Sequence, residues 1–430
     1  MLDIKFIREN AEAVKKDLKR RNDEDKVAWV DELVVKNDEY WKLKVESDKL
    51  RNQRNILTRE INELQKQGKD ISKKVKEAKD LPDSIKQADE RLQQLDERVK
   101  YILARLPNVL HDSVPVGIDE RGNKEIRKWG KPKKPAFELR VHGELLEENG
   151  LADFRRAAKI SGSGFVFLKG GLVQLELALI QFAADLLAKK GFTLVAPPLM
   201  MGRKHYESVT SLNDFENVMY KVDGEDSYLI ATSEHPIAAM FADEVLDESV
   251  LPIRFAGISS CFRREIGSHG VDTRGLFRMH QFSKVEQFVF CKPSESWKVF
   301  EELLGNAEEI FRKLRIPYRV VSICTGDIGS VAAKKYDIEV WFPREEAYKE
   351  VVSCSNCTSY QAVGLNIKYK KKGGGEKDEK EYVHTLNSTA VATSRALRAI
   401  VENYQNKDGS ITVPTALVPY MKGVKVIGKR

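Results

Sequence analysis

Long hydrophobic runs are missing from this sequence of 430 residues, and no stretch approaches the roughly 18 consecutive apolar residues of a membrane-spanning helix. Cysteine is scarce: the five residues are an odd number and lack the spacing of a disulfide framework, which favours a reducing compartment. The first ten residues, MLDIKFIREN, have neither the apolar core of a signal peptide nor the character of a transit peptide. We therefore expect a cytoplasmic protein without a membrane segment.

A strong excess of one charge is also missing. The 72 basic and 65 acidic residues leave a net charge of +7, which indicates at most a mild preference for polyanions. Charged residues nevertheless make up 32% of the chain, and its length suffices for two or three domains with a full hydrophobic core. Where the charges lie therefore matters more than their sum.

Glycine and proline are almost absent from residues 27–106, where only Gly68 and Pro82 occur. Apolar residues recur there in steps of three, four and seven, which is the pattern of a coiled-coil seam. The clearest series are Leu43, Leu50, Leu57 and Leu64, and then Ile85, Ala88, Leu92, Leu95, Val99 and Ile102. We predict an antiparallel helical hairpin over residues 27–106 with its turn near Gly68. Arms of some thirty residues would project roughly 45 Å.

The half of this hairpin nearest its turn is basic. Residues 42–79 contain twelve Lys and Arg against six Asp and Glu. A basic tip on a long arm suits a phosphate backbone better than a protein partner. A charged helix pair that serves only for dimerisation is the alternative that periodicity alone leaves open.

The rest of the chain predicts a linker and a larger domain. Residues 1–110 form the expected N-terminal domain, 111–135 are rich in Pro and Gly and read as a linker, and 136–430 have mixed α and β character. A helix is expected from Leu172 to Lys190, ending at Gly191. Several expected strands adjoin without an intervening helix, which favours an antiparallel sheet flanked by helices. Those strands are FTLVAPPLM, which we expect to be buried, and SYLIAT, IRFAGIS, EQFVF, YRVVSIC and YDIEVWF.

One stretch, CFRREIGSHGVDTRGLFRMHQFSKVEQFVF at residues 261–290, puts many charges beside apolar residues. Read as two strands around a glycine-containing loop, it directs Arg263 and Glu265 the same way on the first strand. Arg278, His280 and Phe282 point the same way on the returning strand, opposite Arg263 and Glu265 around one patch. A guanidinium, a carboxylate and an aromatic ring around one patch suit an anionic, planar substrate such as a nucleotide. A salt-bridge ladder on an exposed sheet face is the structural alternative.

This stretch resembles the second signature motif of class II aminoacyl-tRNA synthetases, in the form found in seryl-tRNA synthetases. The resemblance extends in order along essentially the whole chain. Its other parts are GFTLVAPPLM for motif 1 (about 190–201, with Pro198), TSEHPIAAM for the serine-pocket loop, KEVVSCSNCTSYQA for the metal-and-ATP strand, and LNSTAVATSRALRAIVENYQNKDGSITVPTALVPYM for motif 3 (about 386–405). Motif 2 spans about 259–290.

The resemblance implies a role for each matching residue. Arg263, Glu350 and Arg395 would be catalytic. Serine would contact Thr232, Glu234, Arg263, Glu286, Asn387 and Thr389. ATP would contact Arg263, Arg264, Glu265, Arg278, Met279, His280, Gln281, Phe282, Glu350, Val351, Val352, Ser353 and Arg395, with Phe282 stacked on adenine. Glu350 and Ser353 would hold Mg²⁺. Lys69, Lys73, Lys74 and Lys76, near the hairpin turn, would contact tRNA.

The family's activity would be formation of seryl-adenylate from L-serine and ATP·Mg, followed by transfer of serine to tRNA(Ser), and to tRNA(Sec) where that tRNA exists. The resemblance further implies a homodimer built around motif 1. Cys354 and Cys357 form a CxxC pair without further nearby ligands, so no structural zinc is expected. Val352, Val363 and Gly364 depart from the residues that many family members carry.

Two rival functions remain open. A paralogue that acts on another acceptor should lack the arm or alter the pocket residues. A non-catalytic RNA-binding coiled-coil protein should have lost Arg263, Glu350 or Arg395. The sequence shows none of these losses.

Overall fold

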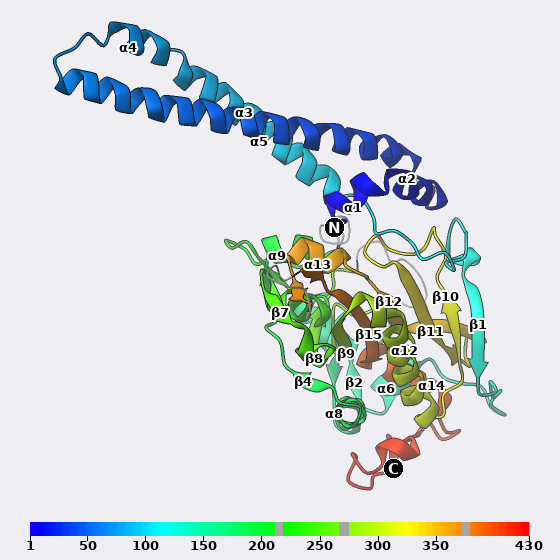
Figure 1. Ribbon diagram of the computed structural model, residues 1–430. Coiled ribbons are helices and arrows are strands. Elements are labelled where there is room, and N and C mark those ends of the chain that lie inside the picture. The colour runs from blue at the N-terminus through cyan, green and yellow to red at the C-terminus, as the bar shows by residue number, and fades with distance from the viewer. Residues whose placement is uncertain (211–217, 266–274, 372–378, 430) are drawn as a thin grey trace. The chain divides into compact units, whose positions relative to one another are not determined.

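The computed structural model describes residues 1–210, 218–265, 275–371 and 379–429 (Figure 1). The chain divides into two compact units. One is Asp3–Leu106, and the other is Pro107–Arg430 together with Met1–Leu2.

The N-terminal unit is helical and contains the predicted antiparallel hairpin (Figure 1). Its helices are α1 (Ile4–Glu9), α2 (Ala11–Arg20), α3 (Val27–Lys66), α4 (Ser72–Ala78) and α5 (Leu81–Leu103). Helix α3 alone has 40 residues and is therefore about 60 Å long. The returning arm is interrupted between α4 and α5, where the heptads predicted one helix. Pro82 lies in the first turn of α5, a position that lacks an intrahelical partner for its nitrogen in any case.

Apolar packing and ion pairs hold the two arms in register. Leu33 and Leu57 of α3 are buried, as are Ile85, Leu95 and Ile102 of α5. Three ion pairs join α3 to α5: Glu32–Arg98 at 2.7 Å, Glu39–Arg91 at 2.6 Å and Arg51–Asp89 at 2.6 Å. Exposed pairs of this kind contribute little stability, so the seam provides most of the stabilisation and the charges select the alignment.

The second unit is built on a mainly antiparallel sheet, as the sequence predicted, and within the described residues this sheet has eight strands. In spatial order its strands are β1 (Lys124–Trp129), β10 (Tyr318–Ser322), β11 (Lys334–Phe342), β12 (Ala347–Asn356), β15 (His384–Ala392), β9 (Gln281–Cys291), β8 (Ile253–Phe262) and β4 (Thr193–Val195). Neighbouring strands are antiparallel throughout, except that β4 runs parallel to β8.

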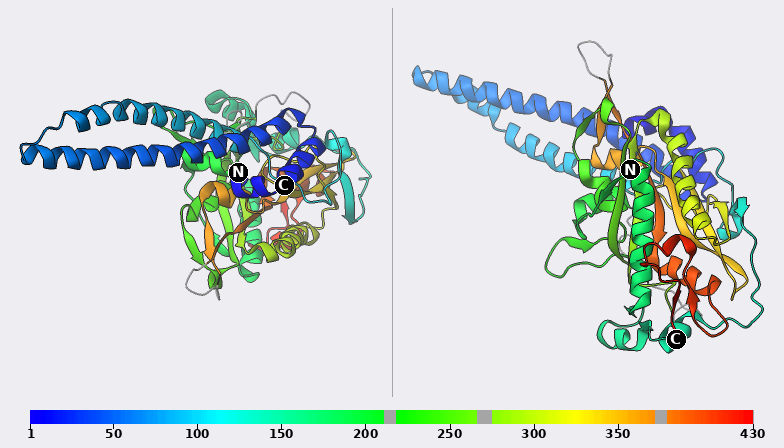
Figure 2. Two further views of the ribbon diagram at one scale, coloured as in Figure 1. Left: turned by 45° about the horizontal axis from the view of Figure 1, so that its top comes forward. Right: turned by 90° about the horizontal axis from the view of Figure 1, so that it is seen from below.

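Helices cover the two faces of this sheet unequally (Figure 2). The larger core lies beneath α8 (Gly171–Lys189), α12 (Ser296–Lys313) and α14 (Thr393–Asn403) and takes Val285 and Val289 from β9. Phe288 and Phe290 of the same strand point to the other face and join a smaller core with α9 (Arg203–Val209), α11 (Glu234–Ala238) and α13 (Tyr360–Leu365). This second face is only partly covered, which leaves space for a cavity.

Short elements complete the unit. They are helices α6 (His142–Glu148) and α7 (Phe154–Ser161) and the small sheets β2 (Ala152–Asp153) with β3 (Phe167–Leu168), β5 (Met200–Gly202) with β6 (Ser227–Leu229), β7 (Val245–Asp247) with β13 (Lys368–Lys370) and β14 (Lys380–Tyr382), and β16 (Ile411–Thr412) with β17 (Val426–Ile427).

Helix α8 confirms the predicted helix and its end, since Gly191 adopts a φ of +84° just beyond it. Among the described helices, α8 alone is long and apolar enough to cross a membrane by length and composition. Half of its most apolar window is buried within this chain. The buried half packs on β8, β9 and β15, where a core helix would lie.

Two sequence expectations differ from the structure. Strand β1 forms inside residues 111–135, where only a linker was predicted, and pairs with β10 at the sheet edge. Its side chains are nearly all exposed, so the strand carries no apolar alternation that a sequence could reveal. The FTLVAPPLM strand was expected to be buried, but Leu194 of β4 is 44% exposed because β4 forms the opposite edge.

Candidate active site

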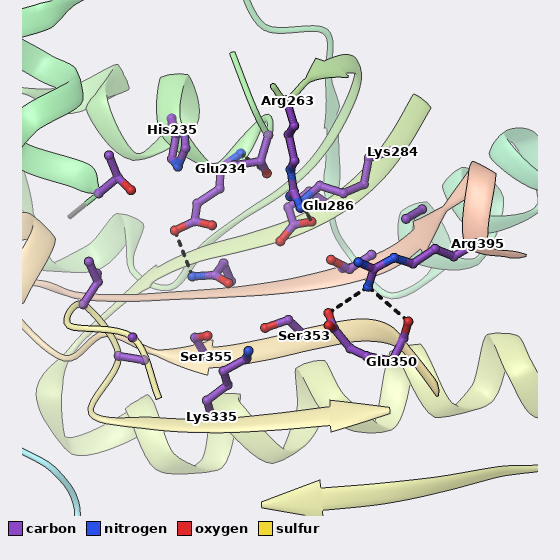
Figure 3. Close-up of a pocket in the computed structure, with 18 of the residues that line it drawn as sticks. Glu234, His235, Arg263, Lys284, Glu286, Lys335, Glu350, Ser353, Ser355 and Arg395 are labelled. Atoms are coloured by element: carbon purple, nitrogen blue, oxygen red, sulfur yellow. Dashed lines mark hydrogen bonds and ion pairs between the residues drawn. The ribbon is translucent and has the colours of Figure 1, made fainter. Parts of the chain in front are cut away.

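A cavity of about 410 Å³ opens on the partly covered face of the sheet (Figure 3). Strands β9, β11, β12 and β15 supply its floor, and the ends of β8, α11 and α14 supply its walls. Four basic side chains, Arg263, Lys284, Lys335 and Arg395, line it together with four carboxylates, Glu234, Glu265, Glu286 and Glu350. Removing this many charged side chains from water costs free energy unless each group has a partner in the protein or binds a charged ligand.

Strand β9 places alternate side chains in the floor. Phe282, Lys284 and Glu286 line the cavity, while Val285 between them points into the core below. Lys284 Nζ and Glu286 Oε2 form an ion pair of 2.7 Å, and both side chains are almost fully buried. On the neighbouring strand β15, Thr389 pairs with Glu286 and directs its hydroxyl-bearing side chain to the same cavity.

A bulge in β12 brings together two residues that ordinary strand alternation would separate. Asp337 of β11 pairs with Ser353, whereas Glu339, two residues later, pairs with Glu350, three residues earlier on β12. The extra residue, Val351, shifts the alternation by one. Glu350 and Ser353 therefore face the same cavity although they are three apart in sequence.

Arg395, in the first turn of α14, is bound to Glu350. Its Nη1 lies 3.1 Å from Glu350 Oε1 and also donates to the Glu350 carbonyl at 3.0 Å (Figure 3). Burial alone would raise the pKa of Glu350, but Arg395, Lys335 and Arg263 outweigh it and lower the pKa to about 2. Glu350 is therefore an anion at neutral pH and can act as an oxygen ligand.

Arg263 lies between two different parts of the cavity. Its Nε donates to the Ala231 carbonyl at 3.3 Å, next to Thr232, and its guanidinium carbon lies 5.3 Å from the centroid of the Phe282 ring. The polar groups around Thr232 are thus on one side of Arg263 and an aromatic face is on the other.

Glu234 forms the polar end of the cavity. Its Oε1 accepts hydrogen bonds from Gln361 Nε2 at 2.9 Å and from Asn387 Nδ2 at 3.1 Å. Burial and the nearby Glu286 raise the pKa of Glu234 to about 7. Gln361 in turn accepts from the Thr385 hydroxyl at 2.7 Å, so the carboxyl group is held from two neighbouring elements.

Sequence reasoning missed two charged groups of the floor, Lys284 and Lys335, and the buried Asp337 that pairs with Lys335. Lys335 Nζ lies 3.3 Å from Asp337 Oδ2, and Asp337 is buried. Burial raises the pKa of Asp337 to about 7, and Glu350 adds to the increase. No local motif marks these residues, but the alternation of FSKVEQF would have placed Lys284 on the face of Glu286, a residue already assigned.

Several predicted ATP contacts do not line this cavity: Arg264, Arg278, His280, Gln281 and Val352. The two strands predicted around this loop extended too far into it. In the structure β8 ends at Phe262 and β9 begins at Gln281. Before β9 it is Phe277 and Met279 that face the cavity, so Arg278 and His280 are not on the side of Phe282. His280 stacks on Phe165 instead.

Val352 belongs to the apolar core on the opposite face, so its departure from the family pattern does not alter the cavity. Gly364 lies on α13 against α9, where an added Cβ would approach the Ser208 carbonyl oxygen to 3.0 Å. The close packing of these two helices explains why a larger residue is absent there. Most of the predicted GSHGVDTRG loop lies outside the described residues.

Of the four lysines predicted near the hairpin turn, Lys69, Lys73 and Lys76 are exposed. Lys74 is half-buried and pairs with Glu60 at 2.8 Å and Glu77 at 3.4 Å. The five cysteines are all buried and unbridged. Within the described ranges, no group of three or more His, Cys, Asp and Glu side chains is arranged to hold a metal ion.

Comparison with known proteins gives two family matches. Residues 1–110 match the seryl-tRNA synthetase N-terminal domain, and residues 218–404 match the core domain of class II tRNA synthetases for G, H, P, S and T. A serine–tRNA ligase of Methanocella arvoryzae is 59% identical over 427 residues, which cover 99% of this chain and 100% of that protein. The corresponding ligase of Pyrococcus abyssi is 51% identical, with 98% and 96% covered.

A solved structure gives the same result. Seryl-tRNA synthetase from Pyrococcus horikoshii, crystallised with ATP, superposes with a TM-score of 0.90 at 48% identity, and both chains are covered completely. With this identity over the full length, a matching fold and charged groups gathered at one cavity, the chain belongs to the seryl-tRNA synthetases, a family of class II aminoacyl-tRNA synthetases.

Proposed function

We propose that this protein is a serine–tRNA ligase that activates L-serine with ATP and transfers it to tRNA(Ser). The main support for this proposal is the position of Arg263 in the cavity. One cation lies between a polar pocket and the aromatic face of Phe282, where the carboxylate of an amino acid and the α-phosphate of a nucleotide must meet.

In the first step, a serine carboxylate oxygen attacks the α-phosphorus of ATP. The P–O bond to the β-phosphate breaks, and pyrophosphate leaves with the electron pair. Two negative groups react, so the protein needs cations and accurate positioning rather than a nucleophilic side chain. Arg263 neutralises both partners, and Arg395 binds the terminal phosphates.

The serine pocket consists of hydrogen-bonding groups. Thr232, Glu286 and Thr389 surround the hydroxyl and amino groups of serine, and Glu234 and Asn387 close the polar end. An analogue without the hydroxyl would leave these buried groups unpaired, which is the strongest means of rejecting it.

The nucleotide lies along the other half of the cavity. Phe282 stacks on adenine, and Glu265 and Met279 border the base. Glu350 and Ser353 fit a Mg²⁺ ion, because the β12 bulge directs one anionic and one neutral oxygen donor to the same face. When bound, Mg²⁺ neutralises phosphate charge. Arg395 holds the Glu350 carboxylate in place for this role.

In the second step, a hydroxyl of the tRNA's terminal adenosine attacks the carbonyl carbon of seryl-adenylate, and AMP leaves. The helical arm with its basic end binds tRNA(Ser), and Lys69, Lys73 and Lys76 present exposed charges there. A selenocysteine tRNA, where a cell has one, is a second acceptor for the same arm.

The protein acts as a homodimer formed around motif 1. Large apolar side chains of this motif and of α8 before it are uncovered in the single chain: Leu177 on α8 is 60% exposed, and Met200 in the motif is 51% exposed. Leu194 and Leu199 lie in the same segment and are also exposed. Burial of such a surface in a second copy would remove it from water. The cytoplasm is the compartment that supplies ATP, serine and tRNA together.

Serine-dependent exchange of pyrophosphate into ATP, measured with each of the twenty amino acids, tests this function. Exchange with serine alone, followed by charging of tRNA(Ser), is the expected result. Exchange with another amino acid would favour a paralogue, and absence of exchange with RNA binding retained would favour the non-catalytic alternative.

A further inference from the structure

A buried histidine outside the cavity contacts the chain just before the nucleotide side of the site. The backbone N–H of Leu276 donates to His142 Nε2 at 3.1 Å, and both residues are buried. His142 begins α6, far from Leu276 in sequence. The contact fixes the segment that leads through Phe277 and Met279 into β9.

The hydrogen bond determines the tautomer of His142. Because Nε2 accepts, the ring proton is on Nδ1, which faces Glu402 Oε1 at 3.5 Å. Burial lowers the pKa of His142, so the ring is neutral at neutral pH and its Nε2 lone pair is available to Leu276. Glu402 thereby orients the imidazole from the opposite side.

Glu402 belongs to α14, which also carries Arg395. Its Oε1 accepts from Arg398 Nε at 2.9 Å, and all of Arg398 is buried. The guanidinium of Arg398 lies 4.8 Å from the centroid of the Phe277 ring, and that of Arg395 lies 5.2 Å from the same ring. The residue after Leu276 is therefore in contact with two arginines of α14.

Glycine at position 275 makes this contact possible. A Cβ there would lie 2.0 Å from His142 Nε2, and Gly275 has a φ of +146°, where a side chain would be strained. The backbone at Gly275 and the imidazole therefore pack directly against each other.

We propose that His142 is a positioning residue for ATP: by accepting the Leu276 N–H while Glu402 orients its ring, it holds Phe277 in place and through Phe277 keeps Arg395 aligned with the terminal phosphates. The proposal rests on the serine–tRNA ligase function. It assigns to α6 a part in nucleotide binding although no residue of α6 lines the cavity.

Two substitutions separate this role from simple core packing. His142→Asn places its amide at the depth of Nδ1, so it can face Glu402 but cannot reach Leu276. His142→Gln places its amide at the depth of Nε2 and can accept the Leu276 N–H. We expect the KM for ATP in pyrophosphate exchange to rise roughly tenfold in His142→Asn, because a buried N–H loses its partner. The KM for serine should change less than twofold, and His142→Gln should recover most of the ATP affinity.

Hydrogen exchange of the free enzyme gives a readout independent of activity. Amides of residues 275–282 should exchange faster in His142→Asn than in the wild type or His142→Gln. His384→Gln is the matched control: His384 Nδ1 bonds the Ser296 hydroxyl at 2.9 Å, and a Gln amide, which lies at the depth of Nε2, loses this bond outside segment 275–282. It should lower stability without changing the KM for ATP.

Equal KM values for ATP in the wild type and His142→Asn, or equal increases in both His142 variants and His384→Gln, would overturn the proposal. If His142→Asn does not fold, Glu402→Gln tests the link from the other side, and an unchanged KM for ATP there would count against it. If the wild type shows no serine-dependent exchange, the proposed function fails, while hydrogen exchange at 275–282 still decides whether His142 positions this segment.

Discussion

Lys284 and Glu286 lie two residues apart on β9 and form a 2.7 Å ion pair that is almost completely shielded from solvent in the cavity floor. Removing two charges from water costs as much as, or more than, their attraction returns, so the pair is a poor device for stability. Its position beside Thr389 and Arg263 gives it a different use. Lys284 holds the Glu286 carboxylate oriented for the polar groups of a substrate.

Glu286→Gln should weaken serine much more than ATP. The amide keeps the shape of the carboxylate but replaces one acceptor oxygen with a donor, and it leaves Lys284 without its counter-ion. We expect the KM for serine in pyrophosphate exchange to rise about tenfold or more, with the KM for ATP changed by less than about threefold.

Thr389→Val is the companion variant, since it removes only a hydroxyl at nearly constant volume. It should reduce the preference for serine over alanine by roughly tenfold. An unchanged serine KM and an unchanged preference in both variants would show that serine binds elsewhere.

Arg263→Ala should reduce serine-dependent exchange by at least about 10²-fold while the protein remains folded, because the developing charge at the α-phosphate loses its donor. Arg264→Ala is the matched control: it removes the neighbouring, exposed guanidinium, which does not line the cavity. Retention of more than about a tenth of wild-type exchange by Arg263→Ala, or equal losses in the two variants, would contradict the role of Arg263.

The metal ligand on the β12 bulge can be tested by Glu350→Gln. The amide keeps the shape of the carboxylate but loses the anionic oxygen donor that the bulge directs to the face of Ser353. We expect a large increase in the Mg²⁺ concentration needed for half-maximal exchange. Val351→Ala, which keeps the bulge and both oxygen donors, should retain the wild-type requirement. Equal Mg²⁺ dependence in Glu350→Gln and the wild type would show that Glu350 does not hold the metal ion.

Ionisation of Glu234 should make the free energy of unfolding depend on pH. Burial and Glu286 raise its pKa from the ordinary 4.5 to about 7, so the folded protein keeps a proton that the unfolded chain releases. Stability therefore falls as the pH rises from about 4.5 to about 7, by at most about 3 kcal/mol, and is level above this range. The free energy of unfolding in urea is measured at each pH for the wild type and for Glu234→Gln. The difference between the two proteins should show this decline, and a difference that is constant with pH would refute it.

The sequence predicted those features that follow from local pattern. The hairpin was visible in the series Leu43 to Leu64 because a coiled-coil seam repeats along the chain, and α8 was visible in its apolar run and Gly191. The residues of motifs 2 and 3 were recognised by resemblance.

What the sequence could not predict depends on contacts between distant segments. The bulge at Val351 follows from pairing with β11, and β1 is a strand only because β10 offers it an edge. The roles of Lys284 and Lys335 follow from their ion pairs with carboxylates, and these pairs form only in the folded sheet. The exposure of Leu194 reflects a surface that the single chain leaves uncovered.

The helical arm should be separable from adenylate chemistry. None of the residues that line the cavity lies between Trp41 and Tyr101, and the basic excess of the arm is near its turn. Replacing residues 41–101 by a short Gly/Ser link should leave serine-dependent pyrophosphate exchange largely intact while charging of tRNA(Ser) falls sharply. Exchange and charging are measured on the same preparation, so that exchange serves as the folding control.

Charge reversal refines the test. Lys73→Glu with Lys76→Glu changes two exposed lysines and should weaken tRNA binding and flatten its dependence on salt, since fewer counter-ions are released. Lys74→Glu alone should have a smaller effect on the salt slope, because Lys74 is already paired with Glu60 and Glu77, although the lost pairs will reduce the arm's stability. Full charging of tRNA(Ser) by the arm-deleted enzyme would show instead that the hairpin serves dimerisation or folding, and the basic tip would then be an ordinary solvated surface.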